Sequence, residues 1–308
     1  MFDDELESFK TKINLSEYAA SRGYALDKRE SSRNSAAMRH PDGDKIVIAR
    51  EESGFWIYFS IRNALDNGTI IDFVQHRDGG SLGKVRQTLR PWLNKSRPSS
   101  QPLAAYVQEL LPIVRDRNAV IKAFEEASVC YSLPYLAGRG LGAEALTNPL
   151  FSGRVRVDQR GNALFPHYDR KGLCGYEMKN KGFTGFAPGG GKGLWFSKAD
   201  LTDRFLVLTE SAIDAISYHL LHPSDPWARY MSTGGELNPQ QPALLRGAME
   251  KLPQGATVLL AFDRDEGGEK IASEIKAVAP ANRDMERVTP DDGFKDWNEV
   301  LMHRLGLG

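Results

Sequence analysis

Residues 205–221 read FLVLTESAIDAISYHLL, which is an apolar run, a glutamate at position 210 and then a helical pattern. Residues 258–268 read VLLAFDRDEGG and repeat this order, with Asp263 and Asp265 after the apolar run. Apolar runs that lead into helices are typical of buried parallel strands. In an open parallel sheet, ligands bind beyond the carboxyl ends of the strands. The sequence therefore predicts that Glu210, Asp263 and Asp265 meet at one edge of a sheet.

The same alternation of apolar runs and helical patterns continues through residues 203–308. We expect strands at residues 204–209, 228–232, 256–262 and 285–289, and helices at residues 211–221, 239–251, 267–278 and 296–304. Strands that alternate with helices favour a parallel sheet with right-handed crossovers. The predicted fold class is α/β.

Three further parts precede this domain. Residues 1–95 predict a small α+β domain, with a hairpin formed by residues 45–50 and 54–60. Residues 96–118 begin with a polar stretch rich in proline and serine, which indicates a linker. Residues 119–202 combine a helix with short, glycine-separated strands, which predicts a mixed α+β subdomain with mostly antiparallel strands.

Composition narrows the class of protein. The 308 residues carry no net charge, but residues 139–204 have 11 Lys/Arg against 6 Asp/Glu, and residues 205–308 have 10 against 16. A basic segment beside an acidic one suits a site where a metal ion meets a polyanion; two ordinary solvated faces are the alternative. Two cysteines and no long apolar stretch predict a cytoplasmic protein with no disulfide framework and no membrane partner.

The acidic strand ends predict a metal site. Three carboxylates held close together repel one another unless a cation lies between them, and hard oxygen ligands suit Mg²⁺ or Mn²⁺. Asp214 lies four residues after Glu210, and Asp296 follows the fourth expected strand, so both are further candidate ligands. Helix capping is the alternative role for Asp214 and Asp296, because aspartate is a common cap.

These motifs, in this order, resemble the Toprim domain that bacterial primases, type IA and type II topoisomerases and some nucleases share. The strand–Glu210–helix unit, the Asp263-x-Asp265 turn and the late Lys295-Asp296 pair each match an element of that domain. The resemblance implies a Rossmann-like parallel sheet for residues 203–308. It also implies that Glu210, Asp263 and Asp265 are catalytic and hold the metal, with Asp214 and Asp296 as further ligands.

The middle region extends the resemblance to primases. Residues 165–179 are similar to a primase pattern in which Lys179 stands in place of an arginine, and residues 191–197 are similar to a lysine-containing segment. Residues 135–141 resemble a segment of plasmid and mobile-element primases, so the likeness spans residues 119–305. It implies that basic side chains here bind template or triphosphate: Arg154, Arg156, Lys179, Lys181 and Lys192. Ordinary surface charge is the alternative for Arg154 and Arg156.

The N-terminal domain resembles the zinc ribbon that precedes the primase core. The expected zinc ligands are missing: Met38 and residues 58–62 stand where cysteines are expected, and only His40 remains. Zinc requires about four ligands, so we expect no bound zinc. The predicted domain is metal-free, with a core filled by Phe55, Trp56, Ile57, Tyr58 and Phe59.

The leading hypothesis is a primase-like, metal-dependent nucleotidyltransferase that acts on single-stranded DNA with nucleoside triphosphates. A plasmid, phage or mobile-element setting follows from the resemblance, with a helicase, a relaxase or another replication protein as candidate partners. A Toprim nuclease that uses the same metal ions is the second hypothesis. The third is a non-catalytic module that binds nucleic acid or a partner protein, such as a regulator or a defence component.

Overall fold

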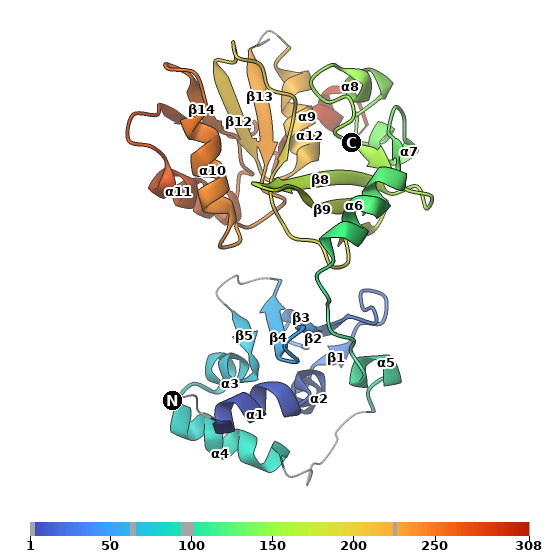
Figure 1. Cartoon of the computed structure of the whole chain (residues 1–308), viewed down its shortest axis with the longest axis vertical. Helices are drawn as coiled ribbons and strands as arrows, with labels where there is room; N and C mark the ends of the chain where they lie inside the picture. The colour runs from blue at the N-terminus through green and yellow to red at the C-terminus, as the bar shows by residue number, and fades with distance from the viewer. Residues whose placement is uncertain (1–3, 62–65, 94–101, 224–226, 308) are drawn as a thin grey trace. The chain divides into compact units, whose positions relative to one another are not determined.

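The computed structural model describes residues 4–61, 66–93, 102–223 and 227–307 (Figure 1). The chain folds into two compact units, residues 1–115 and residues 116–308, which we call the N-terminal and C-terminal units. Each unit is described by itself. Residues 94–101, which hold most of the Pro/Ser-rich stretch of the expected linker, lie outside the described part of the chain.

The N-terminal unit is built around an antiparallel sheet in which the strands follow chain order. Its elements are α1 (Asp4–Lys12), α2 (Leu15–Ser21), β1 (Ala25–Leu26), β2 (Ser35–Arg39), β3 (Lys45–Arg50), β4 (Trp56–Ser60), β5 (Asn67–Thr69), α3 (Ile70–Asp78), α4 (Leu82–Leu93) and α5 (Ala105–Gln108). Helices α1 to α5 contribute apolar side chains to a single core with the inner face of the sheet. The expected hairpin is present as β3 and β4, whereas β2 was not expected from the sequence.

The sequence led us to expect that Phe55, Trp56, Ile57, Tyr58 and Phe59 all fill the core. The structure differs from this expectation. Trp56 and Tyr58 are buried, but Phe59 is 45% exposed and Ile57 is only half-buried. Successive side chains of a strand point to opposite faces, so only every second residue can reach the core. Met38 is fully buried in the same core, on β2.

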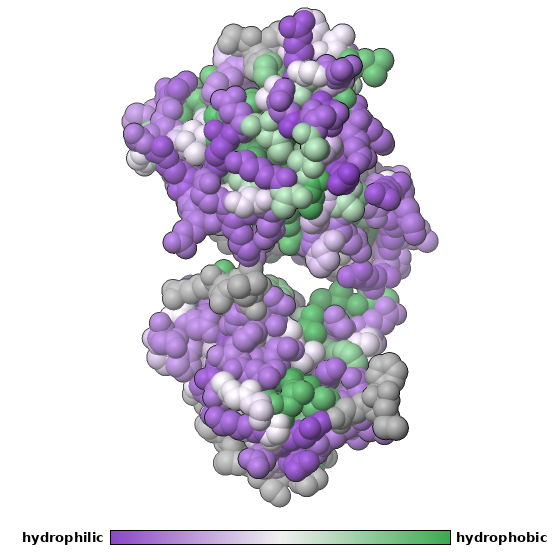
Figure 2. All heavy atoms as spheres, turned by 90° about the vertical axis from the view of Figure 1, so that its left-hand side faces the viewer, coloured by the Kyte–Doolittle hydropathy of each residue, from purple (hydrophilic) through white to green (hydrophobic). Residues whose placement is uncertain are grey.

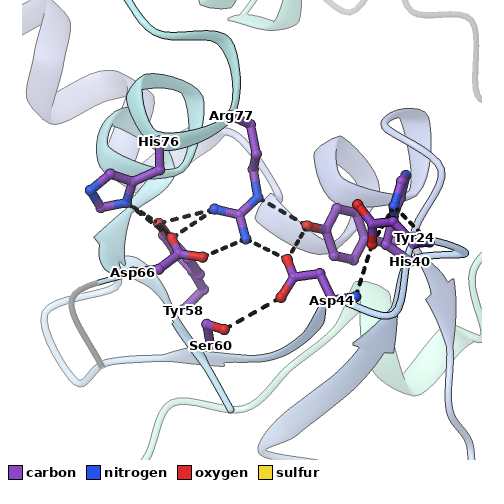
Figure 3. A network of polar contacts seen from close by, with 9 residues as sticks. Tyr24, His40, Asp44, Tyr58, Ser60, Asp66, His76 and Arg77 are labelled. Atoms are coloured by element: carbon purple, nitrogen blue, oxygen red, sulfur yellow. Dashed lines mark hydrogen bonds and ion pairs between the residues drawn. The ribbon is translucent and has the colours of Figure 1, made fainter. Parts of the chain in front are cut away.

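A polar network in the N-terminal unit is centred on Arg77 of α3 (Figure 3). The two terminal nitrogens of its guanidinium lie 2.8 Å from Asp44 and 2.7 Å from Asp66. The guanidinium also lies 4.2 Å from the centre of the Phe73 ring and 5.2 Å from that of Tyr58. Arg77 therefore links the β2–β3 loop, the segment before β5 and helix α3 through a single cation.

The charges of this network hold one another in the ionised form. Burial alone would raise the pKa of Asp66, but hydrogen bonds from Arg77 and Tyr58 outweigh it and hold the pKa below its usual value. Burial likewise opposes the charged form of Arg77, and the hydrogen bonds to Asp66 and Tyr24 raise its pKa above the ordinary value. Burial, with the hydrogen bond to Asp44, raises the pKa of Tyr24 to about 12.

The C-terminal unit contains a five-stranded sheet in the order β11-β13-β12-β14-β15. Its strands are β11 (Trp195–Phe196), β12 (Phe205–Thr209), β13 (Ala228–Ser232), β14 (Thr257–Leu260) and β15 (Met285–Arg287), and its helices are α9 (Ala212–Leu221), α10 (Gln241–Glu250), α11 (Glu266–Val278) and α12 (Trp297–Arg304). Strands β12 to β15 are parallel, and only the edge strand β11 is antiparallel. The predicted α/β class and the four predicted strands and helices are confirmed.

Helices cover both faces of this sheet (Figure 1). Val207 faces a core shared with α9 and α12, whereas Leu206 and Leu208 face a core shared with α10 and α11. Because β12 is buried on both sides, its first four residues are all apolar, and this is why its sequence shows no alternation.

An antiparallel sheet with the order β10-β9-β8-β7-β6 precedes the parallel one. The elements of this region are α6 (Arg117–Glu126), β6 (Ser128–Val129), α7 (Pro134–Ala137), α8 (Ala143–Thr147), β7 (Arg156–Val157), β8 (Ala163–Asp169), β9 (Gly172–Asn180) and β10 (Phe183–Phe186). Ala163 and Phe165 on β8 belong to the same core as α9 and α12, whereas Leu164 and Tyr176 form a separate cluster with residues of α6. The predicted mixed α+β character is confirmed, and the boundary near residue 203 stays a prediction.

Hydrophilic residues dominate the face shown in Figure 2, where the hydrophobic patches are small and separate. Among the described residues, no helix is both long enough and apolar enough to cross a membrane.

Replacement of Arg77 by methionine should destabilise the N-terminal unit, because Asp44 and Asp66 would lose the cation between them. We expect a loss of about 3 kcal/mol, the range for breaking a largely buried ion pair. Hydrogen exchange of the β4 amides measures it. Arg90→Met is the matched control, because Arg90 forms an exposed ion pair with Glu5 and its loss should change stability much less. Equal losses of stability in the two variants would contradict the role of Arg77 as the internal cation of the N-terminal unit.

The N-terminal unit should also lose stability in acid through Asp66. Since its pKa is lower in the folded state, Asp66 contributes stability above its unfolded-state pKa of about 3.9, and this is lost as the pH falls through the folded-state value. The β4 exchange difference between wild type and Asp66→Asn should therefore be largest near pH 7 and shrink toward about pH 3. A difference that does not change with pH would rule out this linkage.

Candidate active site

Two hydrogen-bonded parallel strands bring the acidic residues together. Strand β12 pairs with β14 in register, with Leu208 opposite Leu260. Glu210 therefore follows one strand where Asp263 follows its neighbour, at the same carboxyl edge of the sheet. Burial raises the pKa of both carboxyls, and nearby negative charges add to the rise, since Glu210 acts on Asp263 and Asp265 acts on Glu210.

Asp263 is the most constrained of these carboxylates. It is 7% exposed, and its Oδ1 atom has no hydrogen-bond partner. Burial, followed by the negative charges of Asp214, Glu210 and Asp296, raises the pKa of Asp263 to about 8. Gly268 allows this close packing, because a Cβ atom there would lie 2.1 Å from the Asp263 carbonyl oxygen. A buried oxygen without a partner, aimed among other carboxylates, is a position that a cation would satisfy.

Asp265 uses one carboxylate oxygen to cap a helix and the other to pair with a lysine. Its Oδ1 atom accepts a hydrogen bond of 2.9 Å from the Gly268 amide and so caps α11. Its Oδ2 atom lies 3.1 Å from Lys295 Nζ. Burial alone would raise the pKa of Asp265, but these two contacts outweigh it and lower the pKa.

Glu210 is half-buried, and the charges of Asp265 and of three lysines act on it. Burial and the charge of Asp265 raise its pKa, while Lys295, Lys179 and Lys192 oppose the shift. Its carbonyl oxygen accepts hydrogen bonds from the amides of Gly234, at 2.8 Å, and Gly235, at 3.1 Å. The 234–235 loop is therefore fixed directly beside Glu210.

Asp214 and Asp296 occupy positions where their oxygens already have structural partners. Asp214 is buried, and its two oxygens accept hydrogen bonds from Ser211 Oγ, at 2.5 Å, and from the Asn298 amide, at 3.3 Å. Burial, and then the charge of Asp296, raises the pKa of Asp214 to about 6. Asp296 caps α12 through its Oδ1 atom, which accepts from the Glu299 amide at 2.8 Å. The capping alternative thus describes a contact that Asp296 makes, whereas the cap of α9 is Ser211 and not Asp214.

The donor chemistry of this edge fits a hard divalent cation. Glu210, Asp263 and Asp265 would hold it, since their oxygens are of the kind that Mg²⁺ and Mn²⁺ prefer. In the present arrangement, Lys295 provides the positive charge, with its ammonium 3.8 Å from Asp263 and 3.1 Å from Asp265. Within residues 4–61, 66–93, 102–223 and 227–307, no three His, Cys, Asp or Glu side chains converge as a ready-made metal site.

Arg287 holds the backbone of the acidic turn, a role that was not expected from the sequence. Its guanidinium donates to the carbonyl oxygens of Leu260, Phe262 and Asp263, at 2.7 to 2.9 Å. It was included in the fourth expected strand without a role. Backbone carbonyls carry no sequence signal, so this contact could not be recognised from the residues alone.

The candidate basic residues separate into two groups. Lys179 and Lys192 are close enough to Glu210 that their charges oppose the rise in its pKa. Arg156 instead holds the end of α6, because its Nη1 atom donates to the carbonyls of Phe124, Glu125 and Ala127. Arg154 lies over the Phe196 ring at 4.7 Å, and Lys181 is exposed in the turn between β9 and β10. The nucleic-acid-binding roles of all five stay predictions.

The fold and the site define an α/β protein with a parallel sheet and acidic residues at its carboxyl edge. Residues 207–301 match a family described as Toprim-like, and residues 134–203 match a family described as a protein of unknown function, DUF3991. The C-terminal part of the chain is therefore a Toprim-like domain, as the sequence predicts. No curated protein matches the chain.

The chain also resembles solved primase structures at low identity. The primase fragment of the bacteriophage T7 primase-helicase protein is 20% identical, with a TM-score of 0.43, over 71% of this chain and 82% of that one. The RNA polymerase domain of Mycobacterium tuberculosis primase DnaG, solved with a DNA oligomer, is 18% identical, with a TM-score of 0.38, over 64% and 79%. These likenesses are too weak to support a conclusion about function.

An uncharged side chain at position 263 should stabilise the metal-free protein. We expect Asp263→Asn to raise the stability of the C-terminal unit by about 1 kcal/mol, because folding raises the pKa of the Asp263 carboxyl to about 8, so the wild type must either take up a proton or carry a charge that Glu210 and Asp214 repel. Mg²⁺ or Mn²⁺ should raise the melting temperature of the wild type and leave this variant unchanged. Asp284→Asn, an exposed residue just before β15 and therefore at the opposite end of the sheet, is the matched control. An equal response to metal in all three proteins would remove Asp263 from the site.

Proposed function

We propose that this protein is a primase-like nucleotidyltransferase that joins nucleotides on a single-stranded DNA template. The observation that supports the proposal most directly is the combination of an acidic strand edge with two adjacent lysines. Asp263 presents a buried oxygen without a partner, and Lys179 and Lys192 lie close enough to influence Glu210. Phosphoryl transfer depends mainly on positioning and on charge stabilisation, and this edge offers side chains for both.

In this proposal, Glu210, Asp263 and Asp265 hold one or two Mg²⁺ or Mn²⁺ ions. Such ions neutralise a triphosphate and make the attacking 3′-hydroxyl a better nucleophile. Lys179 and Lys192 bind phosphate oxygens next to Glu210. Lys295 leaves Asp263 and Asp265, which its long and 58% exposed side chain permits. Asp214 and Asp296 orient the helices that follow the strands.

The N-terminal unit is, in the same proposal, a ribbon-like domain without zinc. Arg77 supplies the internal positive charge that links its loops to its helix. The proposed setting is the replication of a plasmid, phage or other mobile element in the cytoplasm. A helicase, a relaxase or another replication protein is the proposed protein partner.

A Toprim nuclease and a non-catalytic binding module use the same fold, and a single assay separates the three functions. The purified chain is incubated with single-stranded DNA, labelled NTPs or dNTPs, and Mg²⁺ or Mn²⁺, and the products are resolved on a denaturing gel. New labelled oligomers should appear with the wild type. Asp263→Ala should abolish them, a loss of at least about 100-fold, because it removes a ligand of the transferred group's cation.

Asp284→Ala is the control for this assay and should retain full synthesis. Shortened DNA without new oligomers would support the nuclease instead. Binding of DNA with neither product would support the non-catalytic module. Synthesis that survives in Asp263→Ala would refute the proposed metal site, even if the protein is a primase.

A further inference from the structure

A second polar cluster lies next to the acidic edge, and none of the steps above uses its two central residues. His167 on β8 is completely buried, and Glu177 on β9 is 8% exposed. The Nε2 atom of His167 faces the Oε2 atom of Glu177 across 3.8 Å, and neither atom has a hydrogen-bond partner. Buried polar groups in this state are uncommon, so the pair requires an explanation beyond packing.

The cluster is attached to the acidic site through the 234–235 loop. A Cβ atom at Gly234 would lie 2.7 Å from the His167 ring and 3.3 Å from Glu177 Cδ, and Gly234 adopts a positive φ of 66°. The amide of the same residue donates to the Glu210 carbonyl at 2.8 Å. Only glycine fits between the two sites. Glu177 therefore lies directly beside the loop that holds Glu210.

The main chain of Lys192 is fixed by the same network. Its carbonyl oxygen accepts from Asn238 Nδ2 at 2.8 Å. The next carbonyl, that of Gly193, accepts from His167 Nδ1 at 2.8 Å and from Gln241 Nε2 at 2.7 Å. The ammonium of Lys192 donates to the Glu236 carbonyl at 2.5 Å, beside the Gly235 backbone. Lys192 is thus built into the site and is not a free surface lysine.

Glu177 is the negative charge that these cations share. Its Oε1 atom lies 3.9 Å from Lys179 Nζ. Burial alone would raise the pKa of Glu177, but His167, Lys179 and Lys192 outweigh it and lower the pKa, so the carboxylate stays ionised. Burial lowers the pKa of Lys192, and the charges of Glu177, Glu210 and Glu236 oppose this. Without Glu177, the positive charges of Lys179 and Lys192 would have one carboxylate fewer to compensate them.

We propose that Glu177 is a positioning residue, whose buried carboxylate holds the ammonium group of Lys179 beside Glu210, where this lysine joins Lys192 in receiving the phosphates of a nucleoside triphosphate. This inference rests on the proposed function and deepens it, because it assigns the polyphosphate to the β9 side of the edge. Glu177 does not touch the phosphates itself. It acts through Lys179.

A double-mutant cycle on the full chain tests this role. Binding of a fluorescent ATP analogue in the presence of Mg²⁺ is measured for wild type, Glu177→Gln, Lys179→Met and the double variant. Each single change should weaken binding about tenfold. The double variant should be no weaker than Lys179→Met alone, because the effect of Glu177 passes through this lysine. Glu177→Asp, which keeps the charge, should recover part of the affinity.

Asp169→Asn is the matched control, since Asp169 pairs with Arg117 on the same β8–β9 hairpin, outside the cluster. It should leave ATP affinity unchanged. Losses that multiply to about 100-fold in the double variant would overturn the positioning role, as would unchanged affinity in Glu177→Gln. If Glu177→Gln does not fold, the cycle is run with Glu177→Asp under the same criteria. A wild type that binds no ATP analogue would refute the proposed function itself.

Discussion

The parallel pairing of β12 with β14 is the constraint on which the acidic site depends. With Leu208 opposite Leu260, the residues that follow the two strands must be neighbours. The chain places carboxylates there, on Glu210 and Asp263, in surroundings that exclude much of the water. Like charges in such a place cost stability unless a cation compensates them. The lysines around the edge compensate this negative charge, so the carboxylates can remain there.

The two units compensate buried carboxylates in different ways. In the N-terminal unit, Arg77 is held by two carboxylates and three aromatic rings, and its planar guanidinium satisfies both acids at once. At the acidic edge, the compensating charge comes from Lys295, whose side chain is 58% exposed. A fixed guanidinium suits a permanent structural link. A flexible ammonium can be displaced, which is what an edge that receives a metal ion requires.

The sequence was informative wherever a pattern is repeated or local. The central strands β12 and β14 are almost entirely apolar because helices cover both faces, and so their positions and the acidic residues after them could be predicted. Strand β2 was missed because it is short and carries small side chains, such as Ala36 and Ala37, that have little strand preference of their own. The roles of Arg156 and Arg287 could not be predicted, since both bind carbonyl oxygens from distant parts of the chain.

The position of the lysines relative to the acids is set by a shared core and not by a linker. The two family matches end and begin at residues 203 and 207, yet Phe165 on β8 and Ile213 on α9 belong to one buried cluster. Asn298 extends this link, because it bonds to the Arg139 carbonyl at 2.8 Å while its amide bonds to Asp214. A β8–β9 hairpin packed in this way cannot move independently of the sheet edge. The distance from Glu177 and its lysines to Glu210 is therefore fixed by packing, and preorganisation of this kind is what electrostatic binding of a polyphosphate needs.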